Sequence, residues 1–490
     1  MASEIMKQKI KDAWIETARK EKAVKQGRLR QRYHFMPQAG WMNDPNGLIY
    51  FRGKYHIFYQ YNPYEAHWGN IHWGHAVSGD MLHWEYLPPA LAPSETYDTG
   101  SEGGCFSGSA IEHEGKLFLM YTGAAETDKG IEQTQCIAYS EDGIHFEKYK
   151  GNPVLTAPEW VASDCFRDPK LWKHSGRYYM VCGAGSKGRG QALLYYSDDL
   201  LHWEFLNVMA ESCGEWGYMW ECPDFYKLED KYVLTFSPIG AGLHTAVYMT
   251  GDFDYHTGKF LPLVCREMDW GFDYYAPQSF RAPDGRRIVI SWANEWEWMP
   301  FYKGRGPVES EGWCGFFNIP REVHLTQDNT LLFSPVNELK QLRHGKQEYP
   351  LFWLGETQKE IKAGDGNSFE IEMEVDLGRT DAERIELDLR CGGRYRTRCV
   401  FDLKKGEMSV DREKSDPWNG GICKSTLFLK GKEKLDIQIY SDRSSLEIFA
   451  NQYQNNHSVN IFPEEDQKRI LIHAHGGNAC VVHCRTYGMA

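Results

Sequence analysis

The sequence of 490 residues contains no long hydrophobic run, and no stretch approaches the roughly 20 apolar residues that a membrane-spanning helix requires. Basic charge is also scarce. Acidic residues outnumber basic ones by 68 to 55, and no tract rich in Lys or Arg carries interleaved aromatic residues. These absences argue against a membrane partner and against a nucleic-acid partner.

Paired cysteines are absent as well. The thirteen cysteines are odd in number and scattered, and none shows the C-x-x-C spacing of a zinc site. We therefore expect reduced thiols, as in a reducing compartment. The first 30 residues lack an apolar segment followed by a small-residue cleavage site, so we expect a cytoplasmic protein.

What the chain does contain is one short pattern repeated five times, in which two apolar runs flank a tight turn. The turns are Gly53-Lys54, Gly115-Lys116, Gly176-Arg177, Asp230-Lys231 and Gly285-Arg286. Their first residues follow one another at intervals of 62, 61, 54 and 55 positions. Each turn with its flanking runs is typical of a β-hairpin.

A second marker keeps step with the first three hairpins, in the segments 80–85, 142–147 and 199–204. Its aromatic residue falls at Trp84, Phe146 and Trp203. A repeat of about 60 residues made only of strands is typical of a propeller blade, and five repeats predict five blades. The alternative is a β-sandwich with frequent hairpin turns, which two independent markers of one period disfavour.

The remaining segments predict four parts in all: a helical extension over 1–31, a five-bladed propeller over 32–335, a linker helix over 336–349 and a β-sandwich over 350–490. The sandwich is predicted from strict apolar-polar alternation, as in 369–375 and 435–439. The N-terminal helix should dock on the propeller through a helically spaced apolar set: Ile5, Met6, Ile10, Trp14, Ile15 and Ala18. A membrane-surface helix is the alternative, disfavoured by its mixed charge.

Three carboxylates stand eight or nine residues before three of the turns: Asp44, Asp168 and Glu221. The first strand of each propeller blade lines the central channel, so these groups should converge there. Asp44 and Glu221 both stand nine residues before their turns. In the third repeat Arg167 occupies that position, and Asp168 follows it by one residue. We therefore expect Asp168 to enter at a different height. The alternative is that Asp44 only forms a turn and that the other two make surface ion pairs.

Carboxylates that face one another repel, which drives their pKa values apart and provides a nucleophile and a general acid. That pair is what glycoside hydrolysis needs, and a third carboxylate could hold sugar hydroxyls. The corresponding positions in the other repeats hold Phe106-Ser107 and Ala276, with Asp273 just before, and Gln60 and Trp68 follow the first hairpin. The spacing of His67, His72 and His75 matches neither a helical metal-binding pair nor a known zinc finger, so we expect structural or substrate-contacting histidines, with no metal and no cofactor.

Six ordered segments resemble the signature blocks of glycoside hydrolase family 32, the invertases and fructanases. They are Trp41-Met42-Asn43-Asp44-Pro45-Asn46-Gly47, Phe106-Ser107-Gly108-Ser109, Phe166-Arg167-Asp168-Pro169, Trp220-Glu221-Cys222-Pro223, Tyr275-Ala276-Pro277-Gln278 and Asp442-Arg443-Ser444-Ser445-Leu446-Glu447-Ile448-Phe449. The likeness runs from about residue 32 to the end. It implies an all-β protein with a five-bladed β-propeller followed by a C-terminal β-sandwich.

The resemblance also implies roles. Asp44 would be the nucleophile, Glu221 the acid and then the base, and Asp168 the group that stabilises the transition state. A retaining pair of this kind lies roughly 5 to 5.5 Å apart. The positions that would bind the fructosyl unit are Asn43, Gln60, Trp68, Phe106, Ser107, Arg167 and Asp273.

We therefore expect a retaining β-fructofuranosidase that acts on sucrose, sucrose 6-phosphate or short fructo-oligosaccharides. Lys303 and Arg305 are candidates for binding a phosphate, although a solvated loop is the simpler interpretation. An inverting arabinan-type furanosidase and a sugar-binding propeller without catalysis are the alternatives. The balance between hydrolysis and fructosyl transfer stays open, and a homo-oligomer is possible from the faces of the sandwich.

Overall fold

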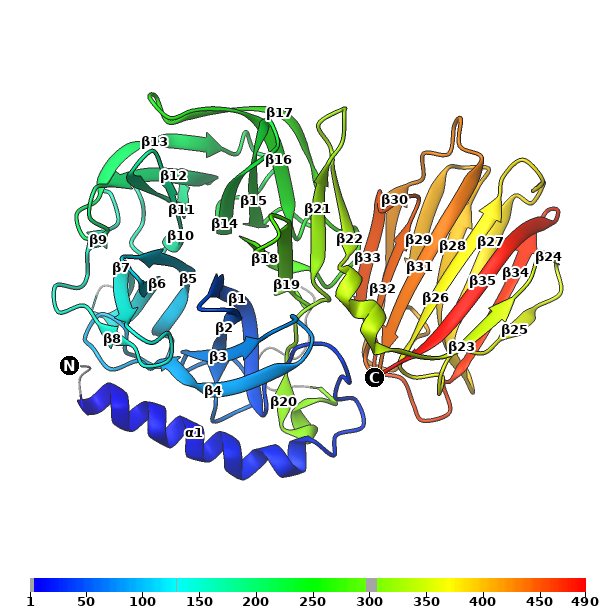
Figure 1. The fold of residues 1–490 in the computed structure, drawn as a ribbon, viewed down its shortest axis with the longest axis horizontal. Helices are drawn as coiled ribbons and strands as arrows, with labels where there is room; N and C mark the ends of the chain where they lie inside the picture. The colour runs from blue at the N-terminus through cyan, green and yellow to red at the C-terminus, as the bar shows by residue number, and fades with distance from the viewer. Residues whose placement is uncertain (1–3, 129, 297–305) are drawn as a thin grey trace.

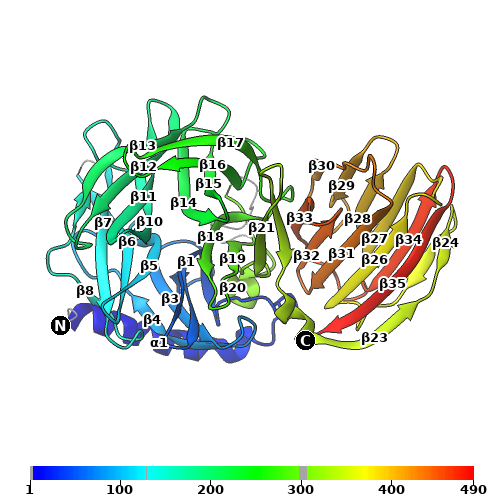
Figure 2. The ribbon, with the colours of Figure 1, turned by 45° about the horizontal axis from the view of Figure 1, so that its top comes forward.

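The computed structural model describes residues 4–128, 130–296 and 306–490. Figure 1 shows a ring of small sheets, a separate sandwich of two larger sheets and one helix below the ring. The turned view in Figure 2 keeps the same division. The predicted fold class, a five-bladed propeller followed by a β-sandwich with a short N-terminal helix, is confirmed. Among the residues described, no helix combines the length and the apolar character that a bilayer crossing needs.

Each blade is an antiparallel sheet whose strands follow one another in sequence, with the first strand innermost. Blade one has β1 (Gly40–Phe51), β2 (Lys54–Asn62), β3 (His72–Ser78) and β4 (Trp84–Leu91). Blade two has β5 (Gly104–His113), β6 (Lys116–Thr127), β7 (Gly130–Ser140) and β8 (Glu147–Lys148), with β9 (Leu155–Thr156) also beside β7. Blade three has β10 (Phe166–His174), β11 (Arg177–Ser186), β12 (Arg189–Ser197) and β13 (Glu204–Glu211).

Blades four and five complete the ring. Blade four has β14 (Met219–Leu228), β15 (Lys231–Ile239), β16 (Val247–Asp254) and β17 (Lys259–Glu267). Blade five has β18 (Tyr275–Arg281), β19 (Arg287–Trp292), β21 (Arg321–Leu325) and β22 (Leu331–Pro335). A 3₁₀ turn (Glu309–Glu311) and the short strand β20 (Trp313–Cys314) lie between β19 and β21, and β20 pairs in parallel with β1. This pairing joins the last blade to the first.

The predicted turns connect the first two strands of each blade. In blades one to three the loop has two residues, both with positive φ: Arg52-Gly53, Glu114-Gly115 and Ser175-Gly176. These are the dihedral angles of the type I′ hairpin turn, whose twist matches that of the strands. A Cβ on Gly53 would meet no atom within 4 Å, so glycine is there for its φ and not for lack of space.

The second marker forms the same turn in three blades, just before the fourth strand. Asp80 Oδ1 accepts hydrogen bonds from the backbone N–H groups of Leu82 and His83, and its Oδ2 lies 2.7 Å from His83 Nδ1. Asp142 and Asp199 make the same contacts in their own blades. The repeated sequence therefore encodes a side-chain-capped turn.

Helix α1 (Glu4–Val24) packs beside β4 of blade one, as expected, but through a different face. The buried residues are Met6, Ala13, Thr17 and Val24, whereas Ile5 and Ile15 are 59% and 55% exposed. Polar contacts fix the helix as well, because Thr17 Oγ1 lies 2.6 Å from the Tyr61 hydroxyl. Apolar spacing identified the helix, whereas the side chains it meets on the propeller select the buried face.

The sandwich consists of two sheets around a separate apolar core. The seven-stranded sheet has β23 (Arg343–Tyr349), β24 (Phe352–Leu354), β26 (Phe369–Asp376), β31 (Lys434–Asp442), β32 (Ser445–Ala450), β33 (Asn455–Asn460) and β35 (Ala479–Met489). The six-stranded sheet has β25 (Lys359–Ile361), β27 (Arg384–Gly392), β28 (Tyr395–Asp402), β29 (Glu407–Asp411), β30 (Ile422–Thr426) and β34 (Arg469–His475). Strand β26 alternates as predicted, with Phe369, Ile371, Met373 and Val375 in the core.

The linker differs from its prediction. A 3₁₀ helix covers Asn337–Leu342, but 343–349 is strand β23, which pairs with the last strand β35. Helical spacing in the sequence ends at Leu342, and the residues after it gain backbone hydrogen bonds from β35. The sandwich therefore begins at Arg343 and not at 350.

Buried ion pairs join the two domains. Arg321 in blade five donates to Asp269 at 2.8 Å and to Glu447 of the sandwich at 2.6 Å. His34 lies between Asp442 and Glu447, at 2.9 and 3.0 Å. Burial opposes the charge on His34, but the two carboxylates outweigh it and raise its pKa to about 9. Burial likewise opposes ionisation of Asp269 and Asp442, yet Arg321 and His34 hold their pKa values below the usual range.

Candidate active site

The site is built where the first strand of each blade bends. A β-bulge interrupts the pairing of β1, β5, β10, β14 and β18 with the next strand, near the start of each. Bulges bend a strand and re-aim its side chains. The two residues at each bend are Asn43-Asp44, Phe106-Ser107, Arg167-Asp168, Glu221-Cys222 and Tyr275-Ala276. Pro or Gly follows each pair.

The pairing register corrects the predicted relation among the three carboxylates. Asp44 and Asp168 occupy the same position of their bulges, and Glu221 stands one residue earlier, at the position of Asn43 and Arg167. Strand β1 contains a second bulge between Asn46 and Ile49. That extra residue lengthens the count from the turn to Asp44 by one, so the expectation that Asp168 is the offset group was wrong.

The bent backbone also connects neighbouring blades. Asp168, Cys222 and Ala276 have positive φ values of 66°, 48° and 51°. Their N–H groups donate to the side chain of the preceding blade: to Thr122, Asp168 and Ser237, at 3.0, 2.8 and 2.8 Å. Positive φ is uncommon for residues other than glycine and is maintained only where the surroundings enforce it. Three successive bends are therefore each held by the neighbouring blade.

These bends surround a pocket of about 480 Å³ at the centre of the ring. Its walls combine carboxylates, amides and aromatic rings from all five blades. The lining residues are Asn43, Asp44, Gln60, Trp68, Glu102, Phe106, Ser107, Ile131, Gln133, Asp164, Arg167, Asp168, Glu221, Pro238, Ile239, Tyr275, Glu295 and Trp296.

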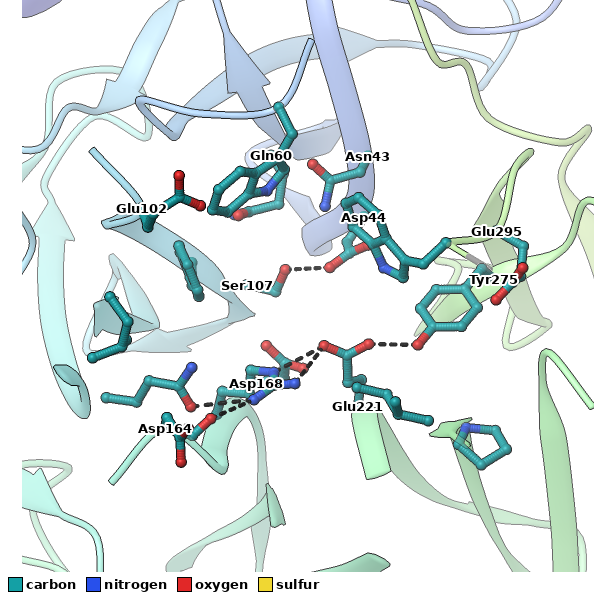
Figure 3. A pocket seen from close by; sticks show the side chains of 18 residues that line it. Asn43, Asp44, Gln60, Glu102, Ser107, Asp164, Asp168, Glu221, Tyr275 and Glu295 are labelled. Carbon is teal, nitrogen blue, oxygen red and sulfur yellow. Dashed lines mark hydrogen bonds and ion pairs between the residues drawn. The ribbon is translucent and has the colours of Figure 1, made fainter. Parts of the chain in front are cut away.

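Asp44 presents one free carboxylate oxygen. Ser107 Oγ donates to Asp44 Oδ2 at 2.6 Å, as Figure 3 shows, whereas Oδ1 is buried and has no hydrogen-bond partner among the described residues. Burial and the charge of Glu221 raise the pKa of Asp44 to about 6, although the hydrogen bond from Ser107 opposes the shift. An oxygen that is not hydrogen-bonded keeps its lone pairs for a ligand.

Glu221 is held through both oxygens. Oε1 lies 2.9 Å from Arg167 Nε and 2.8 Å from Arg167 Nη2, and Oε2 accepts a hydrogen bond from the hydroxyl of Tyr275. Burial and the negative charge of Glu221 hold the pKa of Tyr275 well above its usual range, so Tyr275 stays a donor. Two donors on different blades thus fix the orientation of this carboxylate (Figure 3).

Asp168 contacts blade four mainly through Oδ2. This oxygen accepts the hydrogen bond from Cys222 N and lies 3.5 Å from Cys222 Sγ. Burial raises the pKa of Asp168 to about 7; Arg167 lowers it, and the charges of Glu221 and Asp44 raise it further. The same thiol lies 3.4 Å from Asp44 Oδ2, and burial next to these carboxylates keeps its pKa far above the usual range. Cys222 therefore remains a neutral thiol between two acids.

Six of the seven predicted binding residues line the pocket: Asn43, Gln60, Trp68, Phe106, Ser107 and Arg167. Asp273 does not line it. Its Oδ2 accepts hydrogen bonds at 2.7 Å from Arg412 Nη1 and from Asn460 N, both in the sandwich. Asp273 thus belongs to the contact between the domains, and its assignment to the substrate is corrected. Lys303 and Arg305 lie outside the described residues.

The sequence analysis missed several residues of the pocket. Tyr275 occupies the position of Glu221 in blade five, so the register could have identified it. Gln133, on β7, the third strand of blade two, accepts from Arg167 Nη1 at 3.3 Å and from Phe166 N at 3.0 Å. Glu102, Asp164 and Glu295 lie between strands, where the repeat gives no signal.

The three carboxylates of the pocket have different surroundings. Asp44 has an oxygen without a partner among the described residues, Glu221 lies between two donors, and Asp168 is hydrogen-bonded to the next blade. Together they provide the groups for acid-base and nucleophilic chemistry on a sugar. Comparison with known proteins agrees. The N-terminal domain of glycosyl hydrolases family 32 matches residues 34–335, and the C-terminal domain of that family matches 338–487. The chain is a glycoside hydrolase. It belongs to glycoside hydrolase family 32.

Similar proteins cover almost the whole chain. A sucrose-6-phosphate hydrolase of Escherichia coli is 38% identical over 475 residues, which cover 92% of this chain and 93% of the relative. A raffinose invertase of Escherichia coli is 38% identical, covering 91% and 92%. Among solved structures, a mutant Bombyx mori GH32 β-fructofuranosidase in complex with sucrose has a TM-score of 0.80 at 33% identity, covering 96% and 97%. A Lactobacillus gasseri sucrose-6-phosphate hydrolase has a TM-score of 0.85 at 29% identity, covering 97% and 96%.

Proposed function

We propose that this chain is a retaining β-fructofuranosidase that hydrolyses the terminal β-D-fructofuranosyl unit of sucrose. The observation that carries the proposal is a contrast between two carboxylates that line the pocket. Asp44 has one oxygen without a hydrogen-bond partner among the described residues, whereas Glu221 is oriented by Arg167 and Tyr275. A nucleophile needs a free lone pair, and a proton donor needs a fixed position beside the leaving oxygen.

The reaction has two displacements. In the first, Asp44 Oδ1 attacks the anomeric carbon of the fructosyl unit, the bond from that carbon to the glycosidic oxygen breaks, and Glu221 gives its proton to the departing oxygen. In the second, Glu221 takes a proton from water, the water oxygen attacks the anomeric carbon, and the ester bond to Asp44 breaks. Fructose leaves with its original anomeric configuration. No metal or cofactor takes part in this scheme.

Asp168 would hold the fructosyl hydroxyls through these steps. Its hydrogen bond from Cys222 N falls on Oδ2, and Asp168 lies on the pocket wall in the register position of Asp44. The side chains of Asn43, Gln60 and Ser107 add polar groups, and the rings of Trp68 and Phe106 lie edge to face with centroids 6.0 Å apart. These groups are suited to a sugar with both hydroxyl and C–H surfaces.

The charge of the pocket supports a neutral sugar over a phosphorylated one. Its described lining contains Asp44, Glu102, Asp164, Asp168, Glu221 and Glu295. Within that lining Arg167 is the one Lys or Arg side chain, and Glu221 already pairs with it. A phosphate group would meet like charges there. The comparison of kcat/KM on sucrose, sucrose 6-phosphate and kestose with one preparation tests this ranking, and a higher value for the phosphate ester would reverse it.

The Asp44→Asn variant tests the mechanism. We expect kcat on sucrose to fall at least about 10³-fold, because an amide cannot form the covalent intermediate. Asp80→Asn is the matched control, since it makes the same change in the same blade at an exposed turn. Sucrose turnover by Asp44→Asn near that of the control would contradict the assignment.

The configuration of fresh product separates this reaction from an inverting one. NMR during turnover should record β-fructofuranose first, followed by mutarotation; initial release of the α anomer would favour the inverting alternative. A carboxyl separation of roughly 5 to 5.5 Å between Asp44 and Glu221 belongs to the same proposal.

We also propose a cytoplasmic location. All thirteen cysteines are free thiols, and ten of them are buried. A reducing compartment maintains that state. Association into a homo-oligomer stays a proposal as well, supported by the exposed Leu351, Trp353 and Phe428 of the sandwich. Fractionation of the native cells tests the first, and light scattering after size-exclusion chromatography tests the second.

A further inference from the structure

A cluster of two histidines and one glutamate lies on the sandwich, in the other domain from the pocket. His473 and His475 alternate along β34, and Glu386 on β27 pairs directly with His473. Their neighbours Ile472 and Ala474 point into the core. Because successive side chains of a strand point to opposite faces, the histidines share the outer face of the six-stranded sheet with Glu386.

The three side chains already stand at metal-ligand spacing. His473 Nε2 lies 3.3 Å from Glu386 Oε2, and His475 Nε2 lies 3.6 Å from Glu386 Oε1. One ligand atom from each residue lies within 4.8 Å of the others. Zinc bonds of about 2.0 to 2.1 Å in a tetrahedron place neighbouring ligand atoms about 3.3 Å apart. Small movements would therefore suffice to close the site around an ion.

His473 lacks the partners that a buried imidazole normally has. Only 4% of the residue is exposed, and its Nδ1 has no hydrogen-bond partner among the described residues. A neutral imidazole is the form that binds a metal. His473 Nε2 faces Glu386, so it is the ring nitrogen that a shared ion would meet.

Neighbouring side chains orient His475 and Glu386, as residues around a metal site commonly orient its ligands. Glu356 Oε2 lies 2.6 Å from His475 Nδ1, which leaves His475 Nε2 directed at Glu386. A carboxylate on the far nitrogen of a ligating histidine fixes its tautomer and raises its basicity. Arg398 Nη1 forms an ion pair with Glu386 Oε2 at 2.9 Å, and Arg398 Nε and Nη2 donate to Asp388 at 2.6 and 2.9 Å. Asp388 thus shares the guanidinium of Arg398 with Glu386.

An ion can reach this cluster from solvent. The side chains of His475 and Glu356 are 30% and 68% exposed. Two imidazoles and one carboxylate suit zinc and its neighbours among the transition metals, and not magnesium or calcium, which take oxygen ligands. We propose that His473, His475 and Glu386 bind one Zn²⁺ ion on the outer face of the sandwich, with water in the fourth position.

The position of Glu356 indicates what the ion would do. Residues 355–358 connect β24, which pairs in the seven-stranded sheet, to β25, which pairs in the six-stranded sheet. Glu356 ties this crossing to His475, and Ala474 N donates to Gly355 O at 2.9 Å. An ion bound to His475 would fix the crossing between the sheets and stabilise the sandwich.

Zinc binding to the full chain tests the proposal. Chelator-treated protein is titrated with ZnCl₂ against a chromophoric chelator, and we expect one ion per chain and a Tm that rises with zinc concentration. His475→Ala and Glu386→Gln should each weaken binding at least about tenfold and abolish the rise in Tm. Sucrose turnover should be unchanged in His475→Ala, because this side chain is far from the pocket in sequence and lies in the other domain; that activity reports correct folding.

His483→Ala is the matched control, because it removes a partly buried histidine from β35 in the other sheet. It should bind zinc like the unaltered chain. Absence of stoichiometric binding by the unaltered chain would overturn the proposal. So would equal affinities in His475→Ala and His483→Ala, which would mean that zinc binds elsewhere on the surface.

Discussion

Two sets of buried aspartates in this molecule differ in their pKa values although both are removed from water. Asp44 and Asp168 in the pocket have raised pKa values, about 6 and about 7. Asp269 and Asp442 between the domains have lowered ones. The second pair faces the cations Arg321 and His34. Asp44 and Asp168 lie near each other and Glu221, and at Asp168 the cation Arg167 does not outweigh burial and these charges. Burial acts to raise the pKa of all four aspartates, and among these four the neighbouring charges decide the outcome.

The difference separates two uses of an acid. A carboxylate paired with a cation holds structure, because either partner alone would be an uncompensated buried charge. A carboxylate kept among like charges costs stability and is ready to change protonation state, which is a property of catalytic groups. The glycoside hydrolase therefore contains a structural set and a reactive set of acids in one fold.

The largest effects are expected when one aspartate of each set is replaced by asparagine. Asp269→Asn should lower the free energy of unfolding by about 3 to 5 kcal/mol, because it leaves Arg321 partly unpaired. Asp168→Asn should lower kcat on sucrose by about 10²-fold or more and change stability by less than about 1 kcal/mol, since the amide oxygen still accepts from Cys222 N. Urea unfolding and steady-state kinetics measure both. Equal destabilisation by the two variants would contradict the division into structural and reactive acids.

The pH dependence of stability should follow His34. Its pKa is raised from 6.5 to about 9, so its contribution is complete below pH 6.5 and is lost as the pH rises through about 9. The size of the shift corresponds to about 3 kcal/mol. Urea midpoints between pH 6 and 10 should fall for the unaltered chain and stay flatter for His34→Gln. A parallel fall in both proteins would assign the loss to other groups.

Removal of the Tyr275 hydroxyl should act on the reactive set alone. Tyr275→Phe takes away one of the two donors that hold Glu221, and a hydrogen bond to a charged group corresponds to about a tenfold to hundredfold change in kcat/KM. Tm should stay near that of the unaltered chain. Tyr226→Phe is the control, because its buried hydroxyl, outside the pocket lining, has no hydrogen-bond partner among the described residues.

The smallest expected effect is a shift in the low-pH part of the kcat/KM profile, caused by Ser107→Ala. Turnover needs Asp44 ionised, so the acid limb of kcat/KM should rise with pH through about 6. Ser107 stabilises the ionised form, and Ser107→Ala should move this limb upward by about one pH unit. Profiles of kcat/KM from pH 4 to 8 measure the shift. A downward shift would mean that the limb belongs to another group.

Much of the propeller could be predicted because its signals are local. A two-residue turn such as Arg52-Gly53 and a capped turn such as that at Asp80 fold from neighbouring residues, so their spacing counts the blades. The same counting failed by one residue at Asp44, because the bulge between Asn46 and Ile49 leaves no mark in composition.

Long-range partners explain the remaining differences. Asp273 pairs with Arg412, which lies 139 positions away, and nothing near Asp273 in the sequence indicates the sandwich. Strand β23 likewise depends on β35 at the far end of the chain. Tyr275 was within reach of a register argument, whereas Glu295 lies between strands and follows no repeat.

The hydrogen bond from Cys222 N to Asp168 has a consequence for redesign of the enzyme. Asp168 lines the pocket and also accepts the hydrogen bond that connects blades three and four, so a substitution there affects both the pocket and the packing of the blades. A substitution that removes this acceptor in order to admit another sugar also removes a hydrogen bond that ties blade four, with Glu221, to blade three. Substrate range is therefore more safely varied at the exposed lining residues Glu102 and Asp164 than at the buried Asp168.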